Sequence, residues 1–256
     1  SPDDLSLVRD GAAARRKFMD LAFSQLRPGY AKAISVYNRL HEHKTRILRD
    51  RYDSPSLLDT LDTFNHQIAE SGAVIISYRS AFLKKIAAYA AGIHSDISGG
   101  RERLSLRYKT VSTISDPGAP VGELYEGIMR HMALHRGAEL ASGSALSGPH
   151  KDDIEVYIDG MPARAYASQG QTRTAALSLK LAERELFYED SGEYPVLLLD
   201  DVLSELDGVR RDFVLNRISS GQVLITLCNG EDMSGYGGRM FEISGGAIAG
   251  SAHGEA

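Results

Sequence analysis

The stretch YPVLLLDDVLSELD, residues 194–207, places four consecutive aliphatic residues directly before two adjacent carboxylates. A short apolar run of this kind is typical of a strand that is buried on both faces of a parallel sheet. The strand would deliver Asp200 and Asp201 to the carboxyl edge of the sheet, where open α/β folds bind their ligands. Two neighbouring carboxylates repel one another there unless a cation, a proton or water separates them.

Two interpretations of the acidic pair follow from these residues alone. In nucleotide hydrolases with a Walker B strand, the first Asp helps to hold Mg²⁺ and the next acidic residue orients or deprotonates the attacking water. Asp200 and Asp201 fit those two positions. The alternative is an ordinary strand end whose Asp residues cap the following helix. The acidic pair alone does not distinguish the Walker B interpretation from the capping interpretation, so the neighbouring motifs are needed.

Composition describes a globular chain. With 256 residues, 43% of them hydrophobic, it is long enough to bury a sizeable core. It has no apolar run of the roughly 20 residues that cross a bilayer, and its start lacks a secretion signal, so we expect a cytoplasmic protein without a membrane partner. The single cysteine, Cys228, excludes an internal disulfide and a multi-cysteine metal site. The first residue is not Met, and we expect a fragment of a longer protein.

Charge is distributed unevenly along the chain. Residues 1–110 carry 18 Lys and Arg against 12 Asp and Glu, a balance of +6; the remainder carries 11 against 22, a balance of −11. The first part is therefore the better candidate for contact with a polyanion such as DNA. Solvated helices with surplus basic residues would give the same asymmetry.

The first 100 residues have the pattern of a helical lobe. From about residue 12 to residue 98 apolar residues recur at helical spacing, and Ser54-Pro55 interrupts the pattern. Two long helices joined by a short turn form an αα-hairpin, so we assign residues 1–100 to an all-helical, DNA-facing arm.

Residues 101–256 alternate between strands and helices, which predicts an α/β fold with a mostly parallel sheet. A hairpin is expected around Asp159-Gly160, a favoured turn dipeptide. The predicted strands are 104–112, 153–158, 161–166, 196–199, 222–226, 239–243 and 247–249, and the predicted helices are 121–137, 171–189 and 207–218.

A second motif lies about 30 residues before the acidic pair. In YASQGQTR, residues 166–173, a helix is expected to begin near Gln171, so Ser168 and the backbone N–H of Gly170 would lie at a helix N-terminus. Such an N-terminus binds anions. A plain N-cap explains Ser168 equally well, but it does not explain the order of all three elements: this motif, the acidic strand, and then SELD at residues 204–207.

The ordered set resembles the signature motif, Walker B strand and D-loop of the ABC-type ATPases. Within that class, SGPHKDD (147–153), ASQGQTRTAALSLKLAE (167–183) and LLLDDVLSELD (197–207) resemble the RecF family of bacterial DNA repair proteins. SPDDLSLVRDGAAARRKFMD (1–20) resembles the stretch that opens the helical lobe in that family. The resemblance covers essentially the whole chain.

The resemblance implies an ATPase that forms an ATP-dependent homodimer on DNA at single-strand gaps or junctions, where with RecO and RecR it helps to load recombinase in repair and replication restart. It implies that Asp200 binds Mg²⁺ and that Asp201 takes the catalytic position usually held by Glu. It implies that ATP bound by the other subunit is contacted by the signature residues Ser168, Gln169, Gly170 and Gln171. Ser204 and Asp207 would lie at the dimer seam, and Thr226 takes the place of a switch His.

The sequence also departs from the family pattern. No G-x-x-x-x-G-K-[ST] motif occurs, so the Walker A lysine is absent, and we expect this chain alone to bind ATP poorly and to be almost inactive. Asp201 in place of Glu, and Thr226 in place of His, favour a second hypothesis: a non-catalytic DNA-binding scaffold with a degenerate ATPase site. A third, the nucleotide-binding subunit of a transporter, is disfavoured by the long basic helical hairpin.

Two further sets of residues could have a functional role. The residues His150, Lys151, Asp152 and Asp153 alternate between faces at the start of a strand, which disfavours a metal site and favours a turn or interface role. For contact with DNA phosphates we select Arg46, Arg49, Arg51, Lys84 and Lys85.

Overall fold

The computed structural model of the chain describes residues 6–201, 203, 206–218, 220–227 and 238–254. The chain forms two compact units. The large unit is Asp3–Glu193, and the small unit is Tyr194–Ala256 together with Ser1 and Pro2. The predicted domain boundary near residue 100 falls inside the large unit. That boundary separates a DNA-facing arm from part of an ATPase domain by function, so it stays a prediction.

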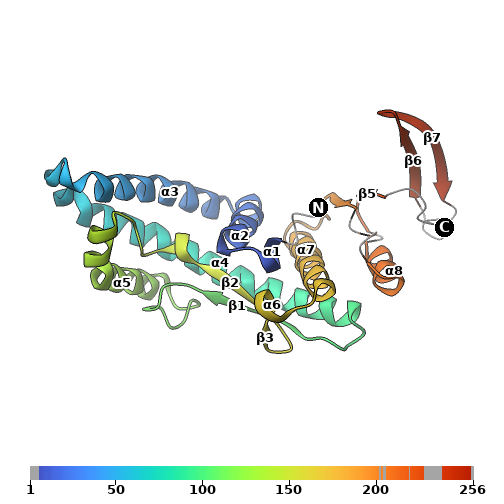
Figure 1. The fold of residues 1–256 in the computed structure, drawn as a ribbon, viewed down its shortest axis with the longest axis horizontal. Coiled ribbons are helices and arrows are strands. Elements are labelled where there is room, and N and C mark those ends of the chain that lie inside the picture. The colour runs from blue at the N-terminus through green and yellow to red at the C-terminus, as the bar shows by residue number, and fades with distance from the viewer. Residues whose placement is uncertain (1–5, 202, 204–205, 219, 228–237, 255–256) are drawn as a thin grey trace. The chain divides into compact units, whose positions relative to one another are not determined.

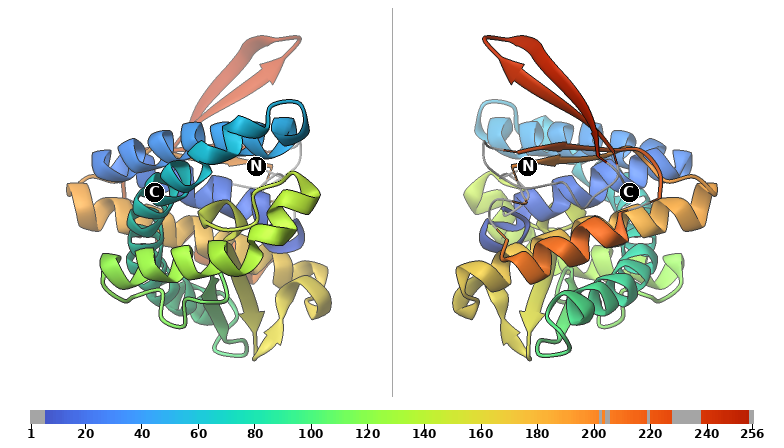
Figure 2. Two further views of the ribbon diagram at one scale, coloured as in Figure 1. Left: turned by 90° about the vertical axis from the view of Figure 1, so that its left-hand side faces the viewer. Right: turned by 90° about the vertical axis from the view of Figure 1, so that its right-hand side faces the viewer.

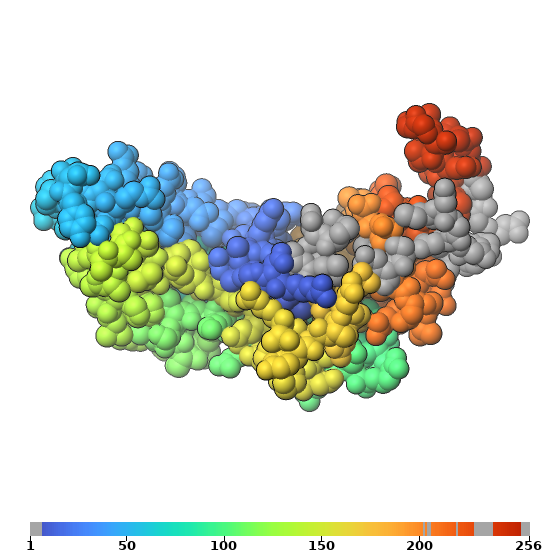
Figure 3. Space-filling view, in the orientation of Figure 1, coloured from blue at the N-terminus to red at the C-terminus, as the bar shows by residue number. Residues whose placement is uncertain are grey.

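Helices dominate the large unit (Figure 1). They are α1 (Ser6–Arg9), α2 (Ala12–Leu26), α3 (Pro28–Arg49), α4 (Leu61–Ile97), α5 (Val121–Ser142), α6 (Ala163–Tyr166) and α7 (Gln169–Ser191). The predicted αα-hairpin is confirmed: α3 packs along α4, and two 3₁₀ turns, Asp50–Tyr52 and Pro55–Thr60, join them. The connection between α3 and α4 forms one end of this unit (Figure 3).

One break in the helical region was not predicted. The chain leaves the helical conformation at Arg27, between α2 and α3, and Pro28 begins the next helix. Proline has no N–H to donate and disfavours helical geometry in the residue before it, which explains an end at this position.

The core of the large unit forms along α4. Its predicted apolar stripe is buried, with Ile68, Ile75 and Ile86 at most 1% exposed. Phe82 packs against Phe23 of α2 with ring centroids 4.4 Å apart. Burying an aliphatic side chain of this size stabilises a fold by about 2 kcal/mol, so α4 is the element on which α2, α3, α5 and α7 assemble.

A small antiparallel sheet packs against α4 and α2 (Figure 2). It contains β1 (Leu104–Lys109), β2 (Asp153–Ile158) and β3 (Met161–Pro162). The predicted Asp159-Gly160 turn joins β2 and β3, and Asp159 adopts a φ of 51°. The predicted second arm of the hairpin was too long, because residues 163–166 form the helical turn α6 instead.

The small unit contains the predicted parallel pair. Strand β4 (Leu197–Asp200) pairs in parallel with β5 (Val223–Thr226), and α8 (Gly208–Arg217) lies between them in sequence. The predicted C-terminal hairpin is also present as β6 (Gly238–Ser244) and β7 (Ala247–Gly254). The chain thus mixes helices with small sheets, as the α/β class predicts, although only the β4–β5 pair is parallel among the described strands.

Burial of β4 on both faces, as predicted from the sequence, is wrong for this chain. Leu199 is 5% exposed, whereas Leu198 is 64% exposed. The described part of the small unit contains the β4–β5 sheet, the β6–β7 hairpin and α8, and Leu199 is the one residue of β4 that is buried.

In the part of the chain that the structure describes, none of the helices combines the length and the apolar character needed to cross a bilayer.

Candidate functional site

The acidic pair stands at the end of β4, where the register of the parallel sheet places Asp200 opposite Thr226. The hydroxyl of Thr226 donates a hydrogen bond of 2.6 Å to Oδ1 of Asp200. Oγ1 of Thr226 in turn accepts the backbone N–H of Asp201 at 3.0 Å. One side chain on β5 therefore fixes both members of the pair at the strand end.

Asp201 leaves the strand in an unusual conformation. Its φ is 52°, in the left-handed region that residues other than glycine seldom adopt, although Asp tolerates it better than most. Such a conformation costs about 1 kcal/mol or more and is over-represented at functional sites. Both carboxylates are exposed to solvent, so each is accessible to a ligand.

The residues present suit Mg²⁺ bound together with phosphate rather than in a protein cage. No group of three or more metal-ligating side chains occurs among the described residues. Mg²⁺ is usually held by one or two carboxylates plus waters and substrate phosphates, so Asp200 meets the requirement for a protein ligand. Its bond from Thr226 would orient the carboxylate, as the outer partners of metal ligands commonly do.

The signature segment begins α7 with a capping box. Ser168 is the N-cap; its Oγ accepts the N–H of Gln171 at 3.2 Å, while Oε1 of Gln171 accepts the N–H of Ser168 at 2.9 Å. In this arrangement the first-turn N–H groups of Gln169 and Gly170 keep no internal acceptor within the described chain. Together with the Ser168 hydroxyl they form a set of donors suited to an anion.

A series of largely buried side-chain contacts connects this segment to the end of α4. Nε2 of Gln171 donates to Oε1 of Glu102 at 3.3 Å, and Oε2 of Glu102 lies 3.2 Å from Nε2 of His94. The ring of His94 is completely buried near the end of α4, and its Nδ1 lies 3.4 Å from Oγ of Ser178 on α7. Sequence reasoning missed Glu102 and His94, because about 70 residues separate them from the motif they contact.

The remaining predicted site residues belong to the segment after β4. Asp207 is the N-cap of α8 and accepts the N–H of Arg210 at 2.9 Å, so this helix is capped by Asp207 rather than by Asp200 or Asp201. Ser204 and Cys228 lie outside the described residues. Ser168 belongs to the large unit and Asp200 to the small unit, so each half of the site is described in its own unit.

The predicted DNA-contacting residues fall into two groups. Arg46, Arg49 and Arg51 lie where α3 ends, whereas Lys84 and Lys85 lie on α4. Lys84 is 23 residues beyond Leu61, the first residue of α4, which corresponds to about 35 Å along the helix. The five residues therefore do not form one patch.

Some of these side chains are already engaged in the fold. Arg51 donates to the backbone oxygens of Leu48 and Ala141, and Lys85 forms a 2.6 Å ion pair with Glu189. Lys84 and Arg49 are exposed and have no ion-pair partner within the described part of the chain. Arg46 pairs with Asp50 at 3.5 Å, so Lys84 and Arg49 are the better candidates of the five for the predicted phosphate contact.

The stretch SGPHKDD, whose role the sequence left open, anchors the loop before β2. Asp152 is fully buried and accepts a 2.9 Å bond from Arg79 of α4 and another from the hydroxyl of Tyr108. Asp153 accepts two bonds from Arg15, at 2.6 and 2.9 Å. Both carboxylates therefore tie the loop before β2 to the helices, Asp152 to α4 and Asp153 to α2.

His150 completes the anchor. Its Nδ1 lies 2.6 Å from the hydroxyl of Tyr37, its Nε2 lies 3.1 Å from the oxygen of Ala145, and the ring of His41 packs against it at 4.1 Å. Burial, reinforced by the charges of His41, Lys44 and Lys151, lowers the pKa of His150 to about 3. The imidazole is therefore neutral at physiological pH.

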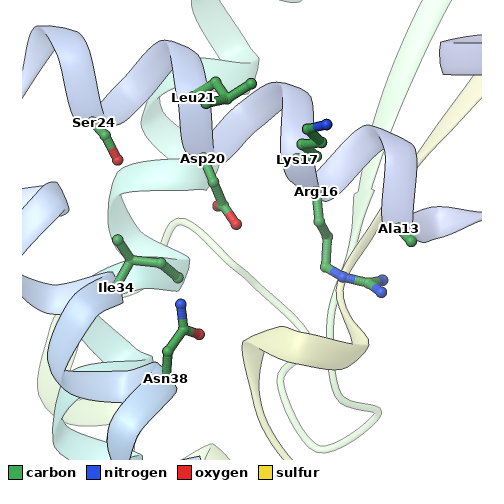
Figure 4. A pocket seen from close by; sticks show the side chains of 8 residues that line it. All are labelled: Ala13, Arg16, Lys17, Asp20, Leu21, Ser24, Ile34 and Asn38. Atoms are coloured by element: carbon green, nitrogen blue, oxygen red, sulfur yellow. The ribbon is translucent and has the colours of Figure 1, made fainter. Parts of the chain in front are cut away.

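An open groove of about 450 Å³ lies between α2 and α3, but it holds none of the predicted site residues (Figure 4). It is lined by Ala13, Arg16, Lys17, Asp20, Leu21, Ser24, Ile34 and Asn38. Two of its polar side chains are committed to the fold, because Arg16 donates to the backbone oxygen of Asp152 and Asp20 accepts from Arg79. The groove is therefore a poor candidate for nucleotide.

Comparison with known proteins identifies the family. No family model matches the chain. The DNA replication and repair protein RecF of Agathobacter rectalis is 41% identical over 232 residues, which are 91% of this chain and 61% of that protein. The RecF of Clostridium perfringens is 33% identical over 251 residues, which are 97% of this chain and 67% of that protein.

Solved structures agree. The recombination mediator protein RecF in the RecFOR pathway, as RecF-ATPrS, has a TM-score of 0.87 and 33% identity, covering 97% of this chain and 66% of that one. As RecF-ATP, it has a TM-score of 0.82 and 32% identity, covering 99% and 66%.

This fold defines the class of protein as an ABC-type ATPase head. Within that class, the chain belongs to the RecF family of DNA replication and repair proteins. It spans 59% to 67% of the length of the curated relatives that it matches.

Proposed function

We propose that the chain is part of a cytoplasmic, ATP-dependent DNA clamp that acts in recombinational repair and replication restart, and that with RecO and RecR it helps to load recombinase at single-strand gaps. Membership of the RecF family supports a role in DNA replication and repair. The solved relative RecF-ATP, named as a mediator of the RecFOR pathway, supports ATP as the ligand. The observation that carries the proposal is the carboxylate pair fixed by Thr226 at the end of a parallel strand.

In this proposal each half of the site has a separate task. Asp200 holds Mg²⁺, and Asp201 positions the attacking water. The ion, when bound, would neutralise charge that develops on the phosphates. Thr226 holds the carboxylate of Asp200 and the backbone N–H of Asp201 rather than sensing phosphate directly, because its hydroxyl is occupied by these two hydrogen bonds.

The signature segment acts on nucleotide bound by a second copy of the protein. Ser168 donates its hydroxyl hydrogen, and the N–H groups of Gln169 and Gly170 point to the γ-phosphate, while Gln171 holds the capping box together. Ser204 and Asp207 lie at the seam between the two copies. ATP then links the heads, and hydrolysis releases them.

Single-turnover ATP hydrolysis by the intact protein tests the enzymatic part. Asp200→Asn should lower the rate at least about 100-fold, because the metal loses its anionic ligand. Asp212→Asn, an exposed carboxylate on α8, serves as the control and should hydrolyse ATP at the wild-type rate. Equal hydrolysis rates for Asp200→Asn and wild type would contradict the proposed ATPase activity. The non-catalytic DNA-binding scaffold would then be the remaining hypothesis.

That scaffold is a second candidate because of one observation. Asp201 occupies the usual Glu position with a shorter side chain and a left-handed backbone, so it is placed differently from a Glu in an extended strand. Asp201→Glu in the intact protein distinguishes the two functions. A hydrolysis rate that stays at background in wild type and variant alike, with DNA binding retained, would favour the scaffold.

DNA binding should rest on phosphate contacts and should therefore weaken steeply with salt. For gapped duplex bound to the intact protein, Lys84→Ala should reduce the slope of log K against log[salt] by about 1. Lys85→Ala should reduce it by less, because Glu189 already pairs with that ammonium. Unchanged slopes in both variants would place the DNA surface elsewhere.

A further inference from the structure

The signature segment is held by more than its own capping box. Gln171, whose side chain closes the box, is itself bound through Nε2 by Oε1 of Glu102. Glu102 belongs to the tight turn that follows α4, where its N–H donates to the Ser98 hydroxyl at 3.2 Å. The carboxylate is only 16% exposed, so solvent screens its contacts weakly.

The second oxygen of Glu102 is buried beside the ring of His94. It lies 3.2 Å from Nε2 of His94, whose ring is completely buried between α4 and α7. One carboxylate oxygen thus accepts a hydrogen bond from Gln171, and the other lies within ion-pair distance of His94 without a hydrogen bond between those two atoms. A helix cap alone would need neither residue, since Ser168 and Gln171 already satisfy each other.

We propose that Glu102 is a positioning residue for the signature segment, and that it sets the geometry with which Ser168, Gln169 and Gly170 meet the γ-phosphate carried by a second copy. The inference rests on the proposed function. By holding Gln171 in the capping box, Glu102 keeps the Ser168 N–H turned inward and leaves the next two N–H groups for the anion. It also ties this segment to α4, the central helix of the lobe.

Association of the intact protein tests the proposal, with ATP affinity measured separately. Glu102→Ala should leave binding of a fluorescent ATP analogue to the monomer unchanged, because the signature segment acts on the other copy's nucleotide. It should weaken ATP-dependent dimerisation, measured by analytical ultracentrifugation, by roughly 10- to 100-fold, since both composite sites of a symmetric dimer lose one charge-assisted hydrogen bond.

Conservative rescue separates positioning from general stability. Glu102→Gln retains an acceptor for Gln171 and should dimerise within about threefold of wild type. Glu70→Ala, an exposed carboxylate on α4, is the matched control and should dimerise normally. Gln171→Met should reproduce the defect of Glu102→Ala, and the double variant should be no worse than either single variant, because the two residues act in one chain of contacts.

The outcomes distinguish the inference from the function on which it rests. If Ser168→Ala abolishes ATP-dependent dimerisation and Glu102→Ala does not affect it, the role of Glu102 is wrong and the proposed function stands. If Ser168→Ala also leaves dimerisation intact, the signature function itself fails. A Glu102→Gln variant as defective as Glu102→Ala would likewise overturn positioning through the Gln171 bond.

Discussion

Arg79 shows how a single side chain can organise the large unit. Its guanidinium is 1% exposed and donates to Tyr30, Asp20, Asp152 and the backbone oxygen of Pro149, at 2.7 to 3.0 Å. These partners come from three separate stretches of the chain: α2, the start of α3, and the loop before β2. A buried cation is tolerated only when its donors are satisfied, so Arg79 fixes where those stretches meet.

His150 makes stability depend on pH. Its pKa is lowered to about 3 in the fold, against an ordinary value near 6.5, so the unfolded chain takes up a proton first as pH falls. The stabilisation by neutral His150 is fully present above about pH 6.5 and is lost progressively as pH falls toward 3. Between pH 7 and pH 5 the loss should be about 2 kcal/mol.

Chemical denaturation at a series of pH values measures this effect. His150→Gln should be less stable than wild type at pH 7 but should show a shallower fall in unfolding free energy between pH 7 and 5. His43→Gln, which changes an exposed histidine of α3, should keep the wild-type slope. Identical slopes for His150→Gln and wild type would show that the histidine is not held neutral by burial.

At the scale of elements, a buried ion pair joins α3 to α5. Nζ of Lys44 lies 2.7 Å from Oε2 of Glu139, with side chains 0% and 2% exposed. The other oxygen of Glu139 accepts the N–H of Leu146 at 2.7 Å. Removing one partner of such a pair leaves a buried charge without compensation, and this costs far more than the pair itself contributes.

Lys44→Met should therefore lower the unfolding free energy by about 3 to 5 kcal/mol. Lys44→Met combined with Glu139→Gln should recover most of the loss, because the amide keeps an acceptor for Leu146 and carries no charge. Arg136→Met, which breaks the exposed Arg136–Asp62 pair, should change stability by about 0.5 kcal/mol or less. Urea denaturation of the three variants measures this; a double variant no more stable than Lys44→Met would contradict the explanation.

At the scale of the whole molecule, the two units should differ in local stability. The large unit has a continuous core along α4, whereas β4 and β5 form a sheet of two strands that is covered on one face, with Leu198 64% and Leu224 51% exposed. A two-stranded sheet is marginal in water. In this chain the β4 and β5 amides should exchange hydrogen at least about 100-fold faster than those of Ile75 and Ile76.

Hydrogen exchange followed by mass spectrometry, with peptides covering residues 197–200, 223–226 and 70–80, provides the comparison. The β1–β2 pair serves as an internal reference for a sheet that packs on a helix. Protection of β4 equal to that of α4 would mean that the exposed leucines are covered in solution.

Much of the fold follows from local pattern. The helical hairpin, the Asp159-Gly160 turn, the β4–β5 pairing and the family were all accessible from the sequence, because apolar periodicity, turn chemistry and motif order are local properties of the chain. The break at Pro28 was equally local and was missed because the apolar period continues across it. The assignment of Ser168, Asp200 and the other site residues to ATP remains a prediction.

Only the tertiary structure assigned partners across long separations. It directed Thr226 to the Asp200 carboxylate and the Asp201 backbone, Arg79 to Asp152, and Glu102 to Gln171, none of which has a signal in sequence spacing. It also left Leu198 exposed where the sequence predicted burial, because an apolar residue specifies a preference for the interior and the rest of the fold must supply the covering layer. The sequence by itself thus determined the elements and the family, whereas the packing of distant segments decided which polar groups meet and which apolar face stays uncovered.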